Sequence, residues 1–130
     1  MPQREREKIL VVSRDPRLAD VRKTVLENAG FAVIPATAEN ATEEVRKCEH
    51  LRLIMLGYSV PPAEKRRVWV AVREHCNVPI LELHHNGTPD LMEQDVFAHL
   101  ARQPDDFLDS VRKLLSPARN GRNSTTPKIQ

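Results

Sequence analysis

The sequence contains no hydrophobic run long enough to cross a membrane, which takes about 20 apolar residues. Its first eight residues are mostly charged and lack the apolar stretch of a signal peptide, so we expect a cytoplasmic protein. A strong excess of positive charge is missing too, because 20 basic and 18 acidic residues leave a formal net charge of +2. Charge alone therefore gives no argument for nucleic-acid binding.

Cysteine is also scarce, and the spacing of Cys48 and Cys76 matches no metal-binding motif. Both residues fall near the ends of predicted helices. In the cytoplasm we expect them to be reduced and partly buried.

The 130 residues are enough for one domain, and 40% hydrophobic with 29% charged residues is typical of a soluble globular protein. We expect a charged N-terminal extension over 1–7, a domain over 8–116 and a disordered basic tail over 117–130. Three spaced positive charges in the tail would bind phosphates only weakly, so no nucleic-acid binding is expected from it.

Short apolar runs predict five β-strands. Most of these runs are apolar throughout rather than alternating, which is typical of a parallel sheet covered on both faces. Pro35 is compatible with the second strand only if that strand lies at an edge of the sheet or ends there. The predicted strands span 8–13, 31–36, 51–56, 78–83 and 96–100.

Helices are predicted between the strands. Asp15 and Pro16 are typical of a helix start, and Gly30 of a helix end; the apolar face should contain Leu18, Val21 and Val25. Further helices are predicted over 37–49, over 63–76 and from 104 to about 115, and 90–94 has room for barely one turn. Because valines alternate over 68–72, a strand remains an alternative for that segment.

Strands alternating with helices predict a doubly wound α/β sheet, because crossovers between parallel strands are right-handed. Such folds place functional residues at the carboxyl ends of the strands. The residues expected there are Ser13, Arg14, Gly57, Tyr58, His84 and Leu100.

Several segments, in order and spacing, are similar to one family. They are 9–12 leading to Asp15 and Pro16, 26–31, Pro61 four residues after Gly57, and 78–81. From about residue 8 to 115 the chain resembles the receiver domain of bacterial two-component response regulators, the CheY-like family. The resemblance implies a flavodoxin-like (βα)5 fold with strand order 2-1-3-4-5.

The resemblance also locates the phosphorylation site of the family. At the two acidic positions that bind magnesium in receivers, this chain has Ser13 and Arg14, and only the neighbouring Asp15 is acidic. The phosphoacceptor aspartate is replaced by Gly57, which has no side chain to phosphorylate. A hard cation prefers several oxygen ligands, so we expect no metal here.

The remaining family positions fall just after the fourth predicted strand and on the fifth. His84 replaces the hydroxyl residue and Leu100 the lysine, whereas Phe97 retains the switch aromatic. Little is left to stabilise a transferring phosphoryl group, so we predict a pseudo-receiver that is not an enzyme and needs no cofactor.

The stretch from His84 to Phe97 is several residues shorter than in receivers. We therefore expect the fourth helix to be short or missing. In the family this helix, the fifth strand and the fifth helix carry dimerisation or effector contacts, so the output surface should differ in shape.

Three side chains or groups each have two interpretations. Arg14 is either a fixed positive charge in the pocket or the partner of Asp15, Glu82 or another carboxylate. His84 and His85, with Glu82, Asp15 or His99, are conceivable metal ligands, but adjacent strand residues point to opposite faces. Trp69 either packs against the core or anchors a partner.

These observations favour a phosphorylation-independent protein-interaction module in signal transduction, whose partner is another signalling protein or a second copy of the chain. One alternative is a sensor in which Arg14 and His84 receive a small anion in space left open by Gly57. Another is the receiver fragment of a DNA-binding transcriptional regulator.

Overall fold

The computed structural model describes residues 6–85, 87–103 and 106–115. The predicted tail, most of the predicted N-terminal extension, and Pro104 with Asp105 lie outside the described residues. Within the described part of the chain, no helix is both long and apolar enough to cross a membrane.

Five parallel strands form one sheet in the order β2-β1-β3-β4-β5, which confirms the predicted fold and strand order. Each strand forms where an apolar run was found, because a strand covered on both faces buries every side chain. The strands are β1 Lys8–Val12, β2 Ala32–Ala36, β3 Leu51–Leu56, β4 Ile80–His84 and β5 Val96–Leu100.

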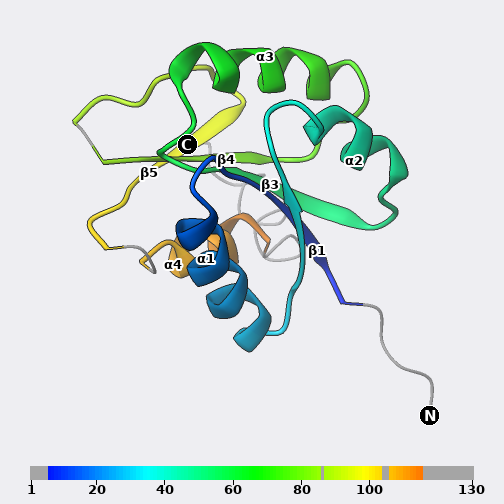
Figure 1. Cartoon of the computed structure of the whole chain (residues 1–130), viewed down its shortest axis with the longest axis vertical. Coiled ribbons are helices and arrows are strands. Elements are labelled where there is room, and N and C mark those ends of the chain that lie inside the picture. The colour runs from blue at the N-terminus through cyan, green and yellow to red at the C-terminus, as the bar shows by residue number, and fades with distance from the viewer. Residues whose placement is uncertain (1–5, 86, 104–105, 116–130) are drawn as a thin grey trace, which may run out of the picture.

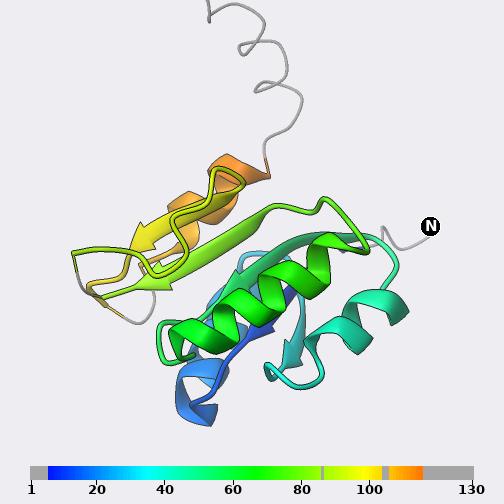
Figure 2. The same cartoon turned by 90° about the horizontal axis from the view of Figure 1, so that it is seen from above.

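Helices cover both faces of this sheet (Figures 1 and 2). On one face lie α2 and α3, and on the other α1 and α4. The bounds of the helices are α1 Pro16–Asn28, α2 Ala41–Lys47, α3 Pro62–Arg73 and α4 Leu108–Leu114. The segment 68–72 is thus helical, and the strand alternative is wrong.

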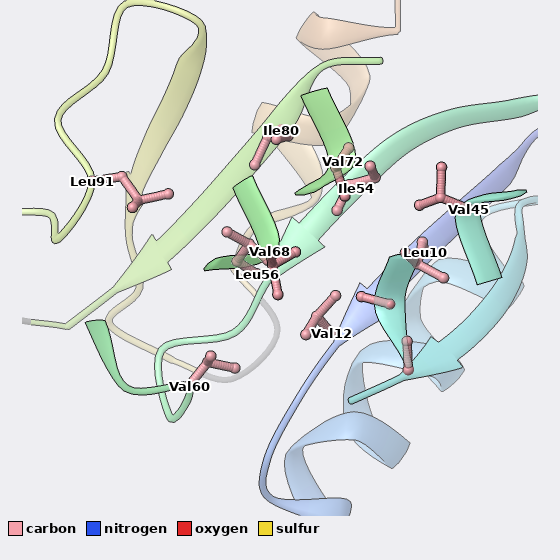
Figure 3. Close-up of a cluster of buried hydrophobic side chains, with 12 residues drawn as sticks. Leu10, Val12, Val45, Ile54, Leu56, Val60, Val68, Val72, Ile80 and Leu91 are labelled. Carbon is pink, nitrogen blue, oxygen red and sulfur yellow. The ribbon is translucent and has the colours of Figure 1, made fainter. Parts of the chain in front are cut away.

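The core has two layers, one on each side of the sheet. Figure 3 shows the layer under α2 and α3, where Leu10, Ile54 and Ile80 of the strands meet Val45 and Val68 of the helices. Alternate strand residues point the other way and pack under α1 and α4. Burial in both layers explains why the strands are apolar throughout.

Both predicted ends of α1 are confirmed. The Asp15 carboxylate accepts the backbone N–H of Arg17 at 3.0 Å, and Gly30 has a φ of 103°, which a side chain would disfavour. The predicted apolar face is wrong in one respect. Val21 is exposed, and the helix buries Arg22 in its place, together with Leu26.

Pro35 lies on the edge strand β2 and is exposed, as predicted. At the opposite edge, no helix separates β4 from β5 within the described residues. The expectation of a short or missing fourth helix is confirmed. Leu91 of this connection is buried in the layer under α3 (Figure 3).

The last helix starts later than predicted, at Leu108. Asp106 is not in its first turn. Its carboxylate instead accepts the backbone N–H groups of Arg102 and Gln103 at 2.8 and 3.2 Å, which holds the chain in a turn before the helix.

Candidate functional site

Ser13 and Gly57 lie side by side where β1 and β3 end, because the two strands are neighbours in the sheet. The backbone N–H of Gly57 donates to the carbonyl of Val12 at 2.9 Å. Both residues are buried. The resemblance would place a phosphoacceptor side chain at this point.

The side chain of Arg22 fills this point instead. A Cβ atom built on Gly57 would lie 2.5 Å from Nη1 of Arg22 and 3.3 Å from the carbonyl oxygen of Val12. Nη1 donates to the Ser13 hydroxyl at 3.1 Å, and the guanidinium carbon lies 5.1 Å from the centre of the Tyr58 ring. The absence of a side chain at Gly57 therefore leaves the space that the guanidinium of Arg22 fills.

Arg22 is fully buried but incompletely hydrogen-bonded. Its Nε and Nη2 atoms have no hydrogen-bond partner among the described residues. Burial lowers the pKa of Arg22, against the opposing attraction of Tyr58 and Asp15. The sequence carried a signal for this residue that we missed: Arg22 lies four residues from both Leu18 and Leu26, inside the apolar stripe of α1.

Arg14 lies at the surface beside this point. Its side chain is 60% exposed and forms an ion pair with Glu64 at 3.3 Å, so the pairing interpretation holds, with a different carboxylate from the two named. The space expected to be open beside Gly57 is occupied by Arg22. A neighbouring cavity of about 150 Å³ is lined by Ser13 and Arg14 but also by Glu39 and Glu64, a mixed charge that does not favour anions.

A second buried cation, Lys65 of α3, was also missed from the sequence. Nζ of Lys65 donates to the carboxylates of Glu82 and Asp90 at 2.9 and 2.8 Å, and to the carbonyl of Leu83 at 3.2 Å. Glu82 also accepts the backbone N–H groups of Asp90 and Leu91 at 2.7 and 3.1 Å. This cluster joins α3, β4 and the connection between β4 and β5.

Further side chains of α3 hold the same connection. Arg66 pairs with Glu93 at 3.2 Å, and Arg73 with Asp95 at 2.5 Å. The indole N–H of Trp69 also donates to Asp95, at 3.1 and 3.2 Å to its two oxygens. Trp69 packs against the core cluster under α3, which supports the packing interpretation. The described residues of the connection thus lie along α3 without forming a helix.

The remaining predicted site residues lie on β4 and β5. His84 ends β4, is only 8% exposed, and stands opposite Leu100 in the register of the two strands. Leu100 and Phe97 are 37% and 47% exposed, so Phe97 is not packed into the interior. The structure therefore brings Ser13 and Gly57 together and leaves Phe97 and Leu100 on an exposed strand.

His85 and His99 form separate contacts. The ring of His85 packs on Tyr58 with centroids 4.6 Å apart. His99 is hydrogen-bonded through Nδ1 to Ser110 at 2.9 Å and through Nε2 to Asp106 at 3.0 Å, which joins β5 to α4. Across the described ranges, no three His, Cys, Asp or Glu side chains are grouped as a metal site would require.

Hydrogen bonds also set the protonation of Asp106. Burial alone would raise the pKa of its carboxyl, but the N–H groups of Arg102 and Gln103, together with His99, outweigh burial and lower the pKa. The two cysteines are free and partly buried, as expected, and burial raises the pKa of the Cys48 thiol.

No protein-family model matches the sequence, and no curated protein is similar enough in sequence to count as a relative. The fold, in contrast, has solved counterparts. A response regulator receiver protein from Sinorhizobium medicae superposes with a TM-score of 0.71 at 19% identity, over 87% of this chain and 97% of that one.

Two further solved structures have a similar fold. The N-terminal domain of a response regulator/sensory box/GGDEF protein from Carboxydothermus hydrogenoformans has a TM-score of 0.71 and 20% identity, over 90% and 100% of the two chains. A response regulator from Thermotoga maritima, solved with Mg²⁺ and BeF, has a TM-score of 0.69 and 20% identity, over 84% and 99%.

The chain therefore has the CheY-like receiver fold. At these levels of identity the likeness concerns the fold alone. What the chain does with that fold depends on its own residues.

Proposed function

We propose that this chain is a pseudo-receiver, a protein-interaction module in signal transduction that acts without aspartyl phosphorylation. One observation carries the proposal: Nη1 of Arg22 lies 2.5 Å from where a Cβ atom of residue 57 would be, the position at which the resemblance expects a phosphoacceptor. A permanent, buried positive charge at this point cannot be switched by a phosphoryl group that has no residue to receive it.

The neighbouring positions support the same proposal. Magnesium needs several oxygen ligands, whereas Arg14 forms an ion pair with Glu64 and Asp15 caps α1. Leu100, at the position of the lysine that neutralises the phosphate in receivers, has no charge. The scaffold is retained, so binding through its surface is the activity left to it.

The test is incubation of the chain with acetyl phosphate, or with beryllofluoride and magnesium, followed by intact-mass spectrometry and thermal unfolding. We expect no adduct and no magnesium-dependent shift in melting temperature. A stoichiometric adduct would overturn the proposal.

The variant Gly57→Asp sharpens this test. The introduced carboxylate would meet Arg22 in a buried site without a magnesium-binding acidic pair, so we expect it to form an ion pair and to stay unphosphorylated. Proteins captured by the wild-type chain from its own cells should be the same with and without acetyl phosphate. A captured set that depends on acetyl phosphate would contradict phosphorylation independence.

A further inference from the structure

The two edges of the sheet are protected differently. An edge strand exposes unpaired backbone groups, and proteins commonly block them with proline or charged side chains. At one edge, β2 carries Pro35, while Ala32 and Ala36 of the same strand direct their backbone groups toward β1. Because orientation alternates along a strand, Pro35 faces away from the sheet, where its missing N–H blocks pairing.

At the other edge, β5 has no such protection. Its sequence, Val-Phe-Ala-His-Leu, contains no proline, lysine, arginine or carboxylate. Phe97 and Leu100 are 47% and 37% exposed, and Met92 before the strand is 72% exposed. These are three of the five large hydrophobic residues exposed in the described chain.

The outward backbone groups of β5 can be assigned from its pairing with β4. The N–H of Ala101 donates to the carbonyl of His84 at 2.7 Å, so residues 101, 99 and 97 direct their backbone groups to β4. In a parallel ladder alternate residues point to opposite sides. The backbone groups of Ala98 and Leu100 therefore point outward, away from β4.

We propose that this chain forms a homodimer by antiparallel pairing of β5 with β5 of a second copy, centred on Ala98. A second copy is the expected partner, because β5 is complementary to itself in the antiparallel orientation. With Ala98 opposite Ala98, Val96 faces Leu100 of the second copy, and Phe97 faces His99 of the second copy. Because Ala98 and Leu100 direct their backbone groups outward, the two Ala98 residues exchange both hydrogen bonds of an antiparallel ladder pair. The N–H of Val96 already donates to the carbonyl of Glu93 at 3.1 Å, so each pair of Val96 with Leu100 adds one bond, from the N–H of Leu100 to the carbonyl of Val96.

The charges next to β5 favour the same orientation. Before the strand lie Glu93 and Asp95, and after it lies the exposed Arg102. Antiparallel pairing brings Arg102 beside Gln94 and Asp95 of the second copy, whereas parallel pairing would place like charges together. Asp95 remains 43% exposed in its pair with Arg73, so it is accessible to a second cation.

Between β4 and β5 the described residues form no helix. The connection lies along α3, held there by Lys65, Arg66 and Arg73. A two-fold axis through Ala98 would continue two five-stranded sheets into one. This inference names a partner for the proposed interaction module, and to that extent rests on the proposed function.

The experiment measures molecular mass in solution and backbone hydrogen exchange over a range of chain concentrations. We expect a mass that rises with concentration from the 14.8 kDa of one chain to twice that value. The amides of Ala98 and Leu100 should become protected as the dimer forms, whereas those of Phe97 and His99, bonded to β4, should be protected throughout.

Ala98→Pro removes an outward N–H and should abolish the dimer. If this variant does not fold by circular dichroism, Leu100→Lys decides, with Val70→Lys as its control. Val70 is an exposed hydrophobic residue of α3, at 48%, so the same substitution there should leave the dimer intact.

A monomer at every concentration, or a dimer that persists in folded Ala98→Pro or in Leu100→Lys, would overturn the pairing. So would exchange at Ala98 and Leu100 that does not depend on concentration. A monomeric chain that forms no adduct with acetyl phosphate would overturn only the pairing, and an adduct would overturn only the phosphorylation-independent function.

Discussion

Arg22 and Lys65 are both fully buried cations, one beneath each face of the sheet, but their surroundings are opposite. Lys65 has two carboxylates and a carbonyl within hydrogen-bonding distance. Arg22 has one hydroxyl and an aromatic ring, and two of its nitrogens have no partner among the described residues.

The difference separates two uses of a buried charge. A paired buried charge is costly to break, because removing one partner leaves the other buried and uncompensated, even where the pair itself adds little net stability. Lys65 and Glu82 serve in this way to attach the helix-free connection between β4 and β5. Arg22 mainly fills volume beside Gly57, at the cost of an incompletely satisfied guanidinium.

The largest expected effect comes from replacing each cation by methionine. Lys65→Met leaves the Glu82 carboxylate buried without its cation, so we expect a loss of about 3–5 kcal/mol in the free energy of unfolding. Arg22→Met leaves no buried charge and fills similar volume, so we expect a change within about 1 kcal/mol. Urea denaturation measures both, and equal losses would erase the distinction.

A smaller effect tests the match between residues 22 and 57. Gly57→Ala adds a methyl group that overlaps Nη1 of Arg22, and overpacking of this kind typically costs about 1–3 kcal/mol. In an Arg22→Ala background the same substitution fills vacated space and should cost less or stabilise the fold. A double-mutant cycle gives the coupling energy. Equal costs in the two backgrounds would show that Arg22 does not occupy this space in solution.

The smallest effect concerns the pairs at the surface of the connection. The hydrogen bond from Arg73, partly offset by burial and supported by Trp69, lowers the pKa of Asp95. The stabilisation is therefore present above the ordinary aspartate pKa of about 3.9 and is lost as pH falls through the lowered value.

Because Asp95 is 43% exposed, solvent screens its ion pair with Arg73, and exposed pairs typically contribute under about 1 kcal/mol. We expect Asp95→Asn to lower stability slightly at neutral pH and to reduce the loss seen on acidification. Thermal unfolding between neutral and acidic pH measures both. An unchanged acid-induced loss in Asp95→Asn would assign it to other carboxylates.

Much of the fold could be predicted because the decisive signals are local. Apolar runs marked the strands, Asp15 with Pro16 and Gly30 marked the ends of α1, and Pro35 required an edge strand. Strand ends were predicted less well, since the chain leaves β4 only after His84. The start of α4 was missed because Asp106 bonds to the turn before it instead of capping the helix.

For the site, the sequence predicted the positions but not the side chain that fills the space between them. Gly57, Ser13 and Leu100 were singled out by the resemblance as positions where receivers carry the residues of phosphorylation. What occupies the pocket could not be predicted, because the guanidinium of Arg22 reaches Gly57 from a helix 35 residues earlier in the chain. The position of Arg22 inside the apolar stripe of α1 was a local signal. The contact of its guanidinium with Gly57 was not, because it joins distant segments.

By itself, then, the sequence determined the order of elements and the parallel sheet, since each follows from residue type and spacing. Only the tertiary structure decided that Arg22 and Lys65 are buried, that the connection between β4 and β5 lies along α3, and that β5 is an edge strand without proline or charge. Those outcomes depend on contacts between distant segments, which form only when the sheet and its helices pack together.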